Sequence, residues 1–165
     1  MKVLSIDPGL AILGWSLIRT HEDGRHDVQF GTVETPAHLP LNTRLHRLYD
    51  ELKSLCESER PDHLAIETLY FAKNAKTLAQ VGHARGIVLL IASQYRMEVF
   101  EYAPRQIKLA LTGNGSADKI QMQERIKRLM GLKEIPKPDD AADAVAVGLC
   151  HLQYAQVLGK SAVTA

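Results

Sequence analysis

The sequence predicts an α/β fold in which helices cover both faces of a mixed five-stranded sheet. Three observations carry this prediction. The first third of the chain consists of short apolar runs separated by turn residues, the next stretch repeats leucine at helical spacing, and strand-like and helix-like segments alternate after that. With 165 residues, 45% of them hydrophobic, the chain is long enough for one domain with a sizeable core. We expect a single domain over residues 1–158 and a loose tail over 159–165.

Three strands are expected at the start of the chain, over 3–7, 13–18 and 28–35. The turn residues Pro8-Gly9 end the first strand. Glu22-Asp23-Gly24 forms a polar, glycine-containing connection between the second and the third. Because strands joined by such short connections pair with their neighbours, we predict that the sheet begins antiparallel.

Alternating helices and strands are expected from residue 41 onward. Leucines spaced four and three residues apart predict a helix over 41–58, since this spacing places them on one face; they are Leu41, Leu45, Leu48, Leu52 and Leu55. Further strands are expected over 63–67 and 97–102, and further helices over 74–95, 106–111, 117–130 and 140–158. Ser116 is well placed to cap the helix that starts at 117.

Carboxylates stand at the ends of predicted elements. Asp7 closes the first strand, Glu67 closes the fourth, and Asp140 and Asp143 lie one turn apart at the head of the last helix. Asp139 and Asp143 share a helix face nearly as well, so spacing alone leaves Asp139 and Asp140 as alternatives. Mg²⁺ and Mn²⁺ prefer oxygen ligands, and clustered carboxylates repel one another when no cation is present. The sequence therefore predicts a divalent-metal site.

Basic residues are concentrated in the middle of the chain. Residues 73–133 carry 11 Lys and Arg against 4 Asp and Glu, whereas acidic residues predominate on both sides of this segment. Such a segment forms a phosphate-binding face if its basic side chains cluster in space. This distribution favours a nucleic-acid partner.

Other sequence features argue for an intracellular protein. Cys56 and Cys150 are far apart and have no paired metal spacing, so we expect buried thiols and no disulfide. No apolar run approaches the roughly 20 residues of a membrane span, and the N-terminus does not resemble a signal peptide. We expect a soluble, cytoplasmic protein with no membrane association.

Seven groups of short motifs follow one another along nearly the whole chain. They are Ile6-Asp7-Pro8-Gly9 with Gly14-Trp15, Ala65-Ile66-Glu67, Ala72-Lys73-Asn74, Ala84-Arg85-Gly86, Val99-Phe100-Glu101-Tyr102-Ala103 with Arg105-Gln106 and Lys108, Gly115-Ser116-Ala117 with Lys119, and Asp140-Ala141-Ala142-Asp143-Ala144. Together they closely resemble the RuvC family of Holliday junction resolvases. The resemblance implies an RNase H-like fold and an endonuclease that resolves Holliday junctions in homologous recombination and DNA repair. It would do so by paired symmetric nicks that leave 5′-phosphate and 3′-hydroxyl ends.

The resemblance also implies how the acidic residues are used. It matches Asp140 rather than Asp139, so Asp7, Glu67, Asp140 and Asp143 are the expected catalytic metal ligands, holding two Mg²⁺ or Mn²⁺ ions per site. It further implies a homodimer, because two nicks need two active sites. A RuvA/RuvB branch-migration complex is the implied partner.

Several further side chains are expected to contact DNA. They are Tyr70, Phe71, Lys73, Arg85, Lys108, Ser116 and Lys119. The family places an aromatic residue at the position of Tyr70, where it is thought to stack in the open centre of the junction, and Phe71 remains the alternative. Lys119 would oppose the dipole at a helix start, a cost that is easier to understand if a phosphate lies nearby.

Other functions fit this sequence less well. A protein that holds junctions without cutting them is disfavoured, because all four expected ligands are present. An actin-like phosphotransferase would need a second phosphate loop and a longer chain. The alternative that stays open is a related RNase H-fold protein that binds or cuts another branched nucleic acid.

Overall fold

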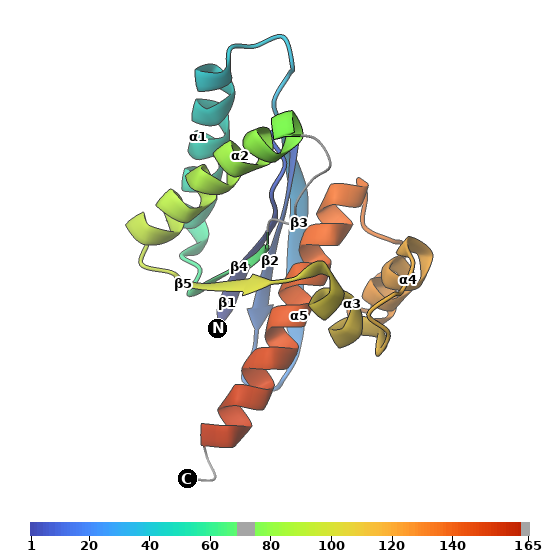
Figure 1. Cartoon of the computed structure of the whole chain (residues 1–165). Coiled ribbons are helices and arrows are strands. Elements are labelled where there is room, and N and C mark those ends of the chain that lie inside the picture. Colours follow the sequence, from blue (N-terminus) through green and yellow to red (C-terminus); the bar gives the residue numbers. More distant parts are fainter. Residues whose placement is uncertain (69–74, 163–165) are drawn as a thin grey trace.

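The computed structural model describes residues 1–68 and 75–162, and it is an α/β fold with one sheet (Figure 1). The strands are β1 (Lys2–Asp7), β2 (Ile12–Thr20), β3 (His26–Glu34), β4 (His63–Glu67) and β5 (Glu98–Tyr102). The helices are α1 (Leu41–Glu59), α2 (Ala75–Gln94), α3 (Pro104–Thr112), α4 (Lys119–Leu129) and α5 (Asp139–Ala162). The order of strands and helices agrees with the order predicted from the sequence.

The five strands form a mixed sheet in the order β3-β2-β1-β4-β5. The pairs β1/β2 and β2/β3 are antiparallel, as the short connections predict, and β4 and β5 are added in parallel on the other side of β1. The β2–β3 turn contains Gly24 at a φ of 82°, a left-handed conformation that glycine adopts without strain. As a result β1 lies at the centre of the sheet, with its end next to the end of β4.

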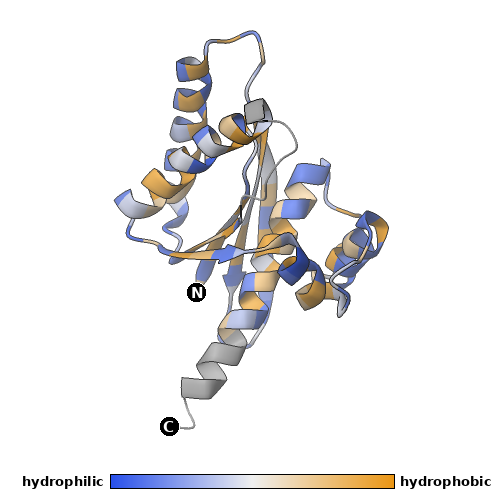
Figure 2. Cartoon of the chain, in the orientation of Figure 1, coloured by the Kyte–Doolittle hydropathy of each residue, from blue (hydrophilic) through white to orange (hydrophobic). Residues whose placement is uncertain are grey.

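Helices cover both faces of the sheet, as predicted (Figure 1). Alternate residues of β1 belong to different cores: Leu4 and Ile6 pack under α1 and α2, whereas Val3 packs on the side of α3, α4 and α5. Figure 2 shows hydrophobic residues gathered on α2 and on the part of α5 that lies along the sheet. By this period of two, Asp7 shares the face of Val3, which is the face that α5 covers.

Small residues bring α5 into close contact with the sheet. The Ser16 hydroxyl donates to the carbonyl oxygen of Ala144 over 3.3 Å. One turn further along α5, a Cβ on Gly148 would lie 2.5 Å from the Ser5 Oγ, so only glycine fits there without a shift. The backbone of α5 therefore rests almost directly on β1 and β2.

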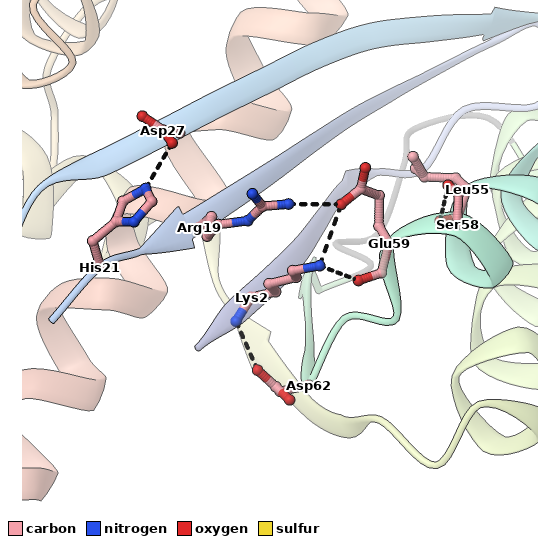
Figure 3. A network of polar contacts seen from close by, with 8 residues as sticks. All are labelled: Lys2, Arg19, His21, Asp27, Leu55, Ser58, Glu59 and Asp62. Atoms are coloured by element: carbon pink, nitrogen blue, oxygen red, sulfur yellow. Dashed lines mark hydrogen bonds and ion pairs between the residues drawn. The ribbon is translucent and has the colours of Figure 1, made fainter.

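Polar contacts close the opposite end of β1 (Figure 3). The Lys2 ammonium donates to the Glu59 carbonyl oxygen over 2.6 Å, and Arg19 pairs with the Glu59 carboxylate at 3.1 Å. The backbone amide of Lys2 donates to Asp62 over 2.7 Å. These contacts join the beginning of β1 to the end of α1 and fix the strand that carries Asp7.

One expectation about a helix end is wrong. The cap of α4 is Asp118 and not Ser116: the Asp118 carboxylate accepts from the Gln121 amide over 2.9 Å, and the Gln121 side chain accepts from the Asp118 amide. A carboxylate with a glutamine three residues on makes this reciprocal box, which Ser116 has no partner to form. Helix α5 extends to Ala162, beyond residue 158 where the sequence predicts its end.

Not all of the leucines that predict α1 are buried. Of the five leucines in α1, Leu48 and Leu52 are buried, whereas Leu41 at the start of the helix is 43% exposed. Among the helices that the structure describes, none is long and apolar enough to cross a membrane.

Candidate active site

Two carboxylates reach the same edge of the sheet because their strands are parallel neighbours. The β1/β4 register pairs Ile6 with Ile66, so Asp7 and Glu67 each follow a paired residue and end their strands side by side. Ala65 packs in the core beneath α5, and Glu67, two residues later, points to the same face. Both carboxylates are half-buried. The sheet thus presents two acids to the head of α5.

The head of α5 adds two more carboxylates to this edge. Asp140 and Asp143 lie in its first turns, and Asp140 is half-buried whereas Asp143 stays accessible to solvent. The backbone of Asp140 lies against Gly14 of β2, which is the residue opposite Asp7 in the antiparallel register. This close approach brings the helix start next to the end of β1.

Electrostatic coupling shows how near these carboxylates are to one another. The pKa of Asp7 is raised to about 7, first by burial and then by the negative charges of Glu67, Asp143 and Asp140, while Lys119 opposes the shift. Burial also raises the pKa of Glu67, with the Asp143 charge adding to the effect. The charges of Glu67, Asp140 and Asp143 thus make ionisation of Asp7 harder, as expected for carboxylates held close together.

Asp143 is partly desolvated by the surrounding protein although water reaches the residue. Desolvation by surrounding protein atoms raises its pKa, and the charges of Asp139 and Asp140 raise it further, whereas Lys119 lowers it. A pocket of about 250 Å³ lies beside it. Its walls are Glu67, Pro104, Ile107, Lys108, Lys119, Met122, Asp143 and Ala146.

The structure separates Asp139 from Asp140, which the spacing alone leaves as alternatives. The Asp139 carboxylate pairs with the Lys119 ammonium at 2.7 Å and accepts from Gln123 over 3.1 Å. These contacts lower the pKa of Asp139 and raise that of Lys119. The charge of Asp140, in contrast, acts on Asp7. The Asp139 carboxylate therefore contacts α4, whereas Asp140 is the one of the two whose charge acts on Asp7.

Divalent cations suit this site by the chemistry of its donors. Carboxylate oxygens are the ligands that Mg²⁺ and Mn²⁺ prefer, and a cation would relieve the repulsion that raises the pKa of Asp7. Within residues 1–68 and 75–162, no three acidic, histidine or cysteine side chains converge closely enough to surround one ion. The chemistry of the donors suits a cation, although their side chains do not converge on one point; of the four carboxylates, Glu67 and Asp143 line the pocket.

Apart from Arg85, the expected DNA contacts fall into three groups. Lys108 and Lys119 line the pocket beside Glu67 and Asp143, and Lys119 stands in the first turn of α4 as the sequence predicts. Ser116 is exposed in the loop before α4, where its amide donates to the Asn114 side chain over 2.9 Å. Tyr70, Phe71 and Lys73 lie outside the described residues.

Arg85 differs from the other expected DNA contacts because its guanidinium turns into the protein. It pairs with Glu101 at 2.7 Å and donates to the Glu67 carbonyl oxygen over 3.0 Å. Sequence analysis also missed the contact of Gly14 with Asp140. A glycine inside a strand, where it weakens the strand unless something approaches closely, is the signal that indicates such a contact.

The sheet order, the covering helices and the acidic cleft define this chain as an RNase H-like nuclease. The family model described as "Crossover junction endodeoxyribonuclease RuvC" matches residues 3–151. Curated proteins of that name are similar: one from Desulfitobacterium hafniense is 44% identical over 97% of both chains, and one from Thermomicrobium roseum is 48% identical over 94% of this chain and 95% of its own. The chain belongs to the RuvC family of crossover junction endodeoxyribonucleases.

Solved structures agree with this assignment. Thermus thermophilus RuvC in complex with a Holliday junction substrate superposes with a TM-score of 0.90 at 32% identity, covering 95% of this chain and 96% of that one. The yeast mitochondrial Holliday junction resolvase Ydc2 superposes with a TM-score of 0.66 at 13% identity, over 92% of this chain and 78% of that one. The second likeness concerns the fold alone.

Proposed function

We propose that this protein is a structure-selective endonuclease that cuts four-way DNA junctions by paired, symmetric nicks. The observation that carries the proposal is the cleft in which the charges of Glu67, Asp140 and Asp143 all raise the pKa of Asp7. Membership of the RuvC family and the likeness to a RuvC bound to a junction support the four-way junction as substrate. The reaction is hydrolysis of a phosphodiester, and it leaves a 5′-phosphate and a 3′-hydroxyl.

The catalytic roles are assigned to Asp7, Glu67, Asp140 and Asp143 as ligands of Mg²⁺ or Mn²⁺, with two ions per site. Such ions supply an activated water and stabilisation of the leaving oxygen. β1 and β4 hold Asp7 and Glu67 on rigid backbone, and the contact between Gly14 and Asp140 sets the position of the α5 head. The protein thereby supplies a fixed set of oxygen donors beside the place where a phosphate would lie.

Phosphate binding is assigned to the basic side of the pocket. Lys108 lies beside Glu67 and lowers its pKa, and Lys119 does the same for Asp7 and Asp143. These lysines would hold the scissile phosphate opposite the carboxylates, with Ser116 at the rim. The remaining DNA contacts are assigned to Tyr70, Phe71 and Lys73, with one of the two aromatic residues stacking on a base.

Assembly follows from the reaction. Two nicks related by symmetry require two active sites, so the working form is a homodimer of the single nuclease domain over residues 1–158. We place this dimer in the cytoplasm and expect it to act with a RuvA/RuvB branch-migration complex.

The test is cleavage of a labelled four-way junction beside a linear duplex of the same sequence, with Mg²⁺, with Mn²⁺ and with EDTA. Paired nicks that appear only in the junction, need the metal and vanish in Asp7→Asn are the expected result. Equal cutting of both substrates would contradict the choice of substrate. Tight junction binding without cleavage in any metal would contradict the enzymatic role.

A further inference from the structure

Arg85 connects three elements at the end of the strand that carries Glu67. Its side chain, on α2, is only 11% exposed. One terminal nitrogen, Nη2, pairs with Glu101 Oε1 of β5 at 2.7 Å, and the other, Nη1, donates to the main-chain carbonyl oxygen of Glu67 over 3.0 Å. A single guanidinium therefore joins α2, β4 and β5 at one point.

That point lies where β4 ends and its regular pairing stops. Glu67 is the last residue of β4 and lies opposite Tyr102 in the parallel register with β5. The next amide, that of Thr68, donates to the Tyr102 carbonyl oxygen over 2.9 Å. Arg85 adds a second anchor at this position, so the main chain of Glu67 is held both by β5 and by α2.

The anchor acts on the main chain of Glu67 and not on its carboxylate. Burial and the charge of Asp143 raise the pKa of that carboxylate, and the cation that lowers it is Lys108. The charge of Arg85 is instead matched by Glu101. Arg85 can thus orient a metal ligand without competing with a metal for its oxygens.

A guanidinium is suited to this task because its donors form a rigid, planar fork. It can satisfy a carboxylate and a carbonyl at the same time, whereas a lysine ammonium on a flexible stem does not hold two partners in one plane. An arginine whose donors are used in this way, and whose side chain is nearly buried, is poorly placed to hold a phosphate.

We propose that Arg85, braced by Glu101, is a positioning residue that fixes the direction of the Glu67 carboxylate toward the metal site. The inference rests on the proposed function in so far as Glu67 is a metal ligand. Groups that orient metal ligands typically change metal affinity or activity by about 10- to 100-fold when removed. Arg85 therefore belongs with the machinery that shapes the site and not with the DNA contacts.

The experiment compares Arg85→Met, Arg85→Lys and Glu101→Gln with wild type, and uses Arg47→Met as a control that removes an exposed arginine from α1. Cleavage of a four-way junction is measured over a range of Mn²⁺ concentrations, together with kcat and KM. Junction binding is measured in EDTA at several salt concentrations. Mn²⁺ binding to the free protein is measured by calorimetry, without DNA.

Arg85→Met is expected to raise the Mn²⁺ concentration needed for half-maximal cleavage by about 10-fold or more and to lower kcat, while junction binding in EDTA stays as in wild type. Arg85→Lys and Glu101→Gln, which each keep one of the two contacts, should lie between. A weaker junction affinity with a smaller salt slope and an unchanged Mn²⁺ requirement would overturn the proposal and return Arg85 to the DNA contacts. If Arg85→Met does not fold, a wild-type Mn²⁺ requirement in the other two variants would overturn it equally.

Calorimetry separates failure of this inference from failure of the proposed function. If wild type binds Mn²⁺ and Arg85→Met binds it at least several-fold more weakly, the positioning role stands even if no junction is cut. If wild type cuts junctions and both proteins bind Mn²⁺ equally, the positioning role is wrong while the proposed function stands. The Arg47→Met control should match wild type in every measurement.

Discussion

Gly14 lies directly against the main chain of Asp140, and a Cβ at position 14 would overlap the Asp140 carbonyl oxygen. The same glycine is the partner of Asp7 in the β1/β2 register. One small residue therefore adjoins a proposed ligand in the sheet and sets how closely the α5 head approaches. The spacing between the two halves of the acidic cleft depends on this missing side chain.

Gly14→Ala should push the α5 head away from the sheet. Because the obstacle is backbone and cannot rotate away, we expect the free energy of unfolding to fall by about 2 to 3 kcal/mol and junction cleavage to fall at least 100-fold. Urea unfolding and the cleavage assay measure both. Gly82→Ala is the matched control, since a Cβ there meets nothing within 4 Å and should leave cleavage unchanged. Wild-type cleavage by Gly14→Ala would mean that the contact does not position the acids.

Asp7→Asn should stabilise the metal-free protein at neutral pH. With a pKa near 7 in the folded state against an ordinary 3.8, Asp7 keeps its proton in the folded chain after the unfolded chain has lost it, so its contribution to stability declines as pH rises from about 4 to 7. The gain in Asp7→Asn should be about 1 to 3 kcal/mol at pH 8 in EDTA after solvent screening. Denaturation at pH 5 and pH 8 tests this, with Glu51→Gln as an exposed-carboxylate control. A gain no larger at pH 8 than at pH 5 would contradict it.

Metal binding should compete with protons at Asp7. As the folded carboxylate is protonated below about pH 7, we expect Mn²⁺ affinity to weaken as pH falls from 7 to 6, with proton release on binding. Saturation at 100 times the dissociation constant should stabilise the fold by about 2.7 kcal/mol. Calorimetry in buffers of different ionisation enthalpy counts the protons, and thermal unfolding reports the stabilisation. Equal affinity at both pH values would show that the ion does not displace a proton from Asp7.

Lys119→Ala should weaken junction binding and reduce the salt dependence by one phosphate contact. Lys119, in the first turn of α4, lines the pocket, and its ammonium pairs with Asp139 at 2.7 Å. Loss of one phosphate contact lowers the salt slope by about 1. Titration of a labelled junction at several salt concentrations in EDTA gives the slope. Asp139→Asn, which frees the lysine without removing it, should retain the wild-type slope; an unchanged slope in Lys119→Ala would return that side chain to the solvated surface.

His151 should make the protein sensitive to acid. It is 1% exposed, with the Tyr102 hydroxyl 2.8 Å from its Nδ1 and His63 Nδ1 2.9 Å from its Nε2, and burial followed by the His63 charge lowers its pKa to about 4. Below pH 6.5 the unfolded chain protonates this histidine while the folded chain does not, so stability falls by about 1.4 kcal/mol per pH unit down to pH 4. His151→Gln should show a shallower decline, whereas His46→Gln, at an exposed position, should follow wild type. Parallel declines in all three would contradict the prediction.

Much of the fold follows from local patterns in the sequence. The short apolar run of β1 predicts a strand that is buried on both faces, and the leucine spacing of α1 predicts a helix that is buried on one face. The turn at Gly24 predicts the antiparallel pairing of β2 with β3 for a similarly local reason. The positions of Asp7 and Glu67 at strand ends also follow, since parallel neighbours end at one edge.

What could not be predicted depends on contacts between distant segments. The spacing of acids on α5 is compatible with Asp139 or Asp140, and only the position of Lys119 across the cleft separates them. Arg85 has an apparent helix-surface position, and no periodicity reveals that it pairs with Glu101 of β5. The cap of α4 is different, because the box of Asp118 with Gln121 is visible in the sequence and outweighs the hydroxyl of Ser116.

The close seating of α5 on the sheet has a consequence for the substrate. Where Ser16 holds the Ala144 carbonyl and Gly148 meets Ser5, the helix backbone packs directly against the sheet, and packing this close resists displacement of the helix along β1. The acids at the start of α5 are consequently held in fixed positions relative to the sheet. If the protein side of the site does not adapt, the DNA has to, and we expect a branched DNA that flexes easily at its centre to be favoured over a stiff duplex of the same sequence.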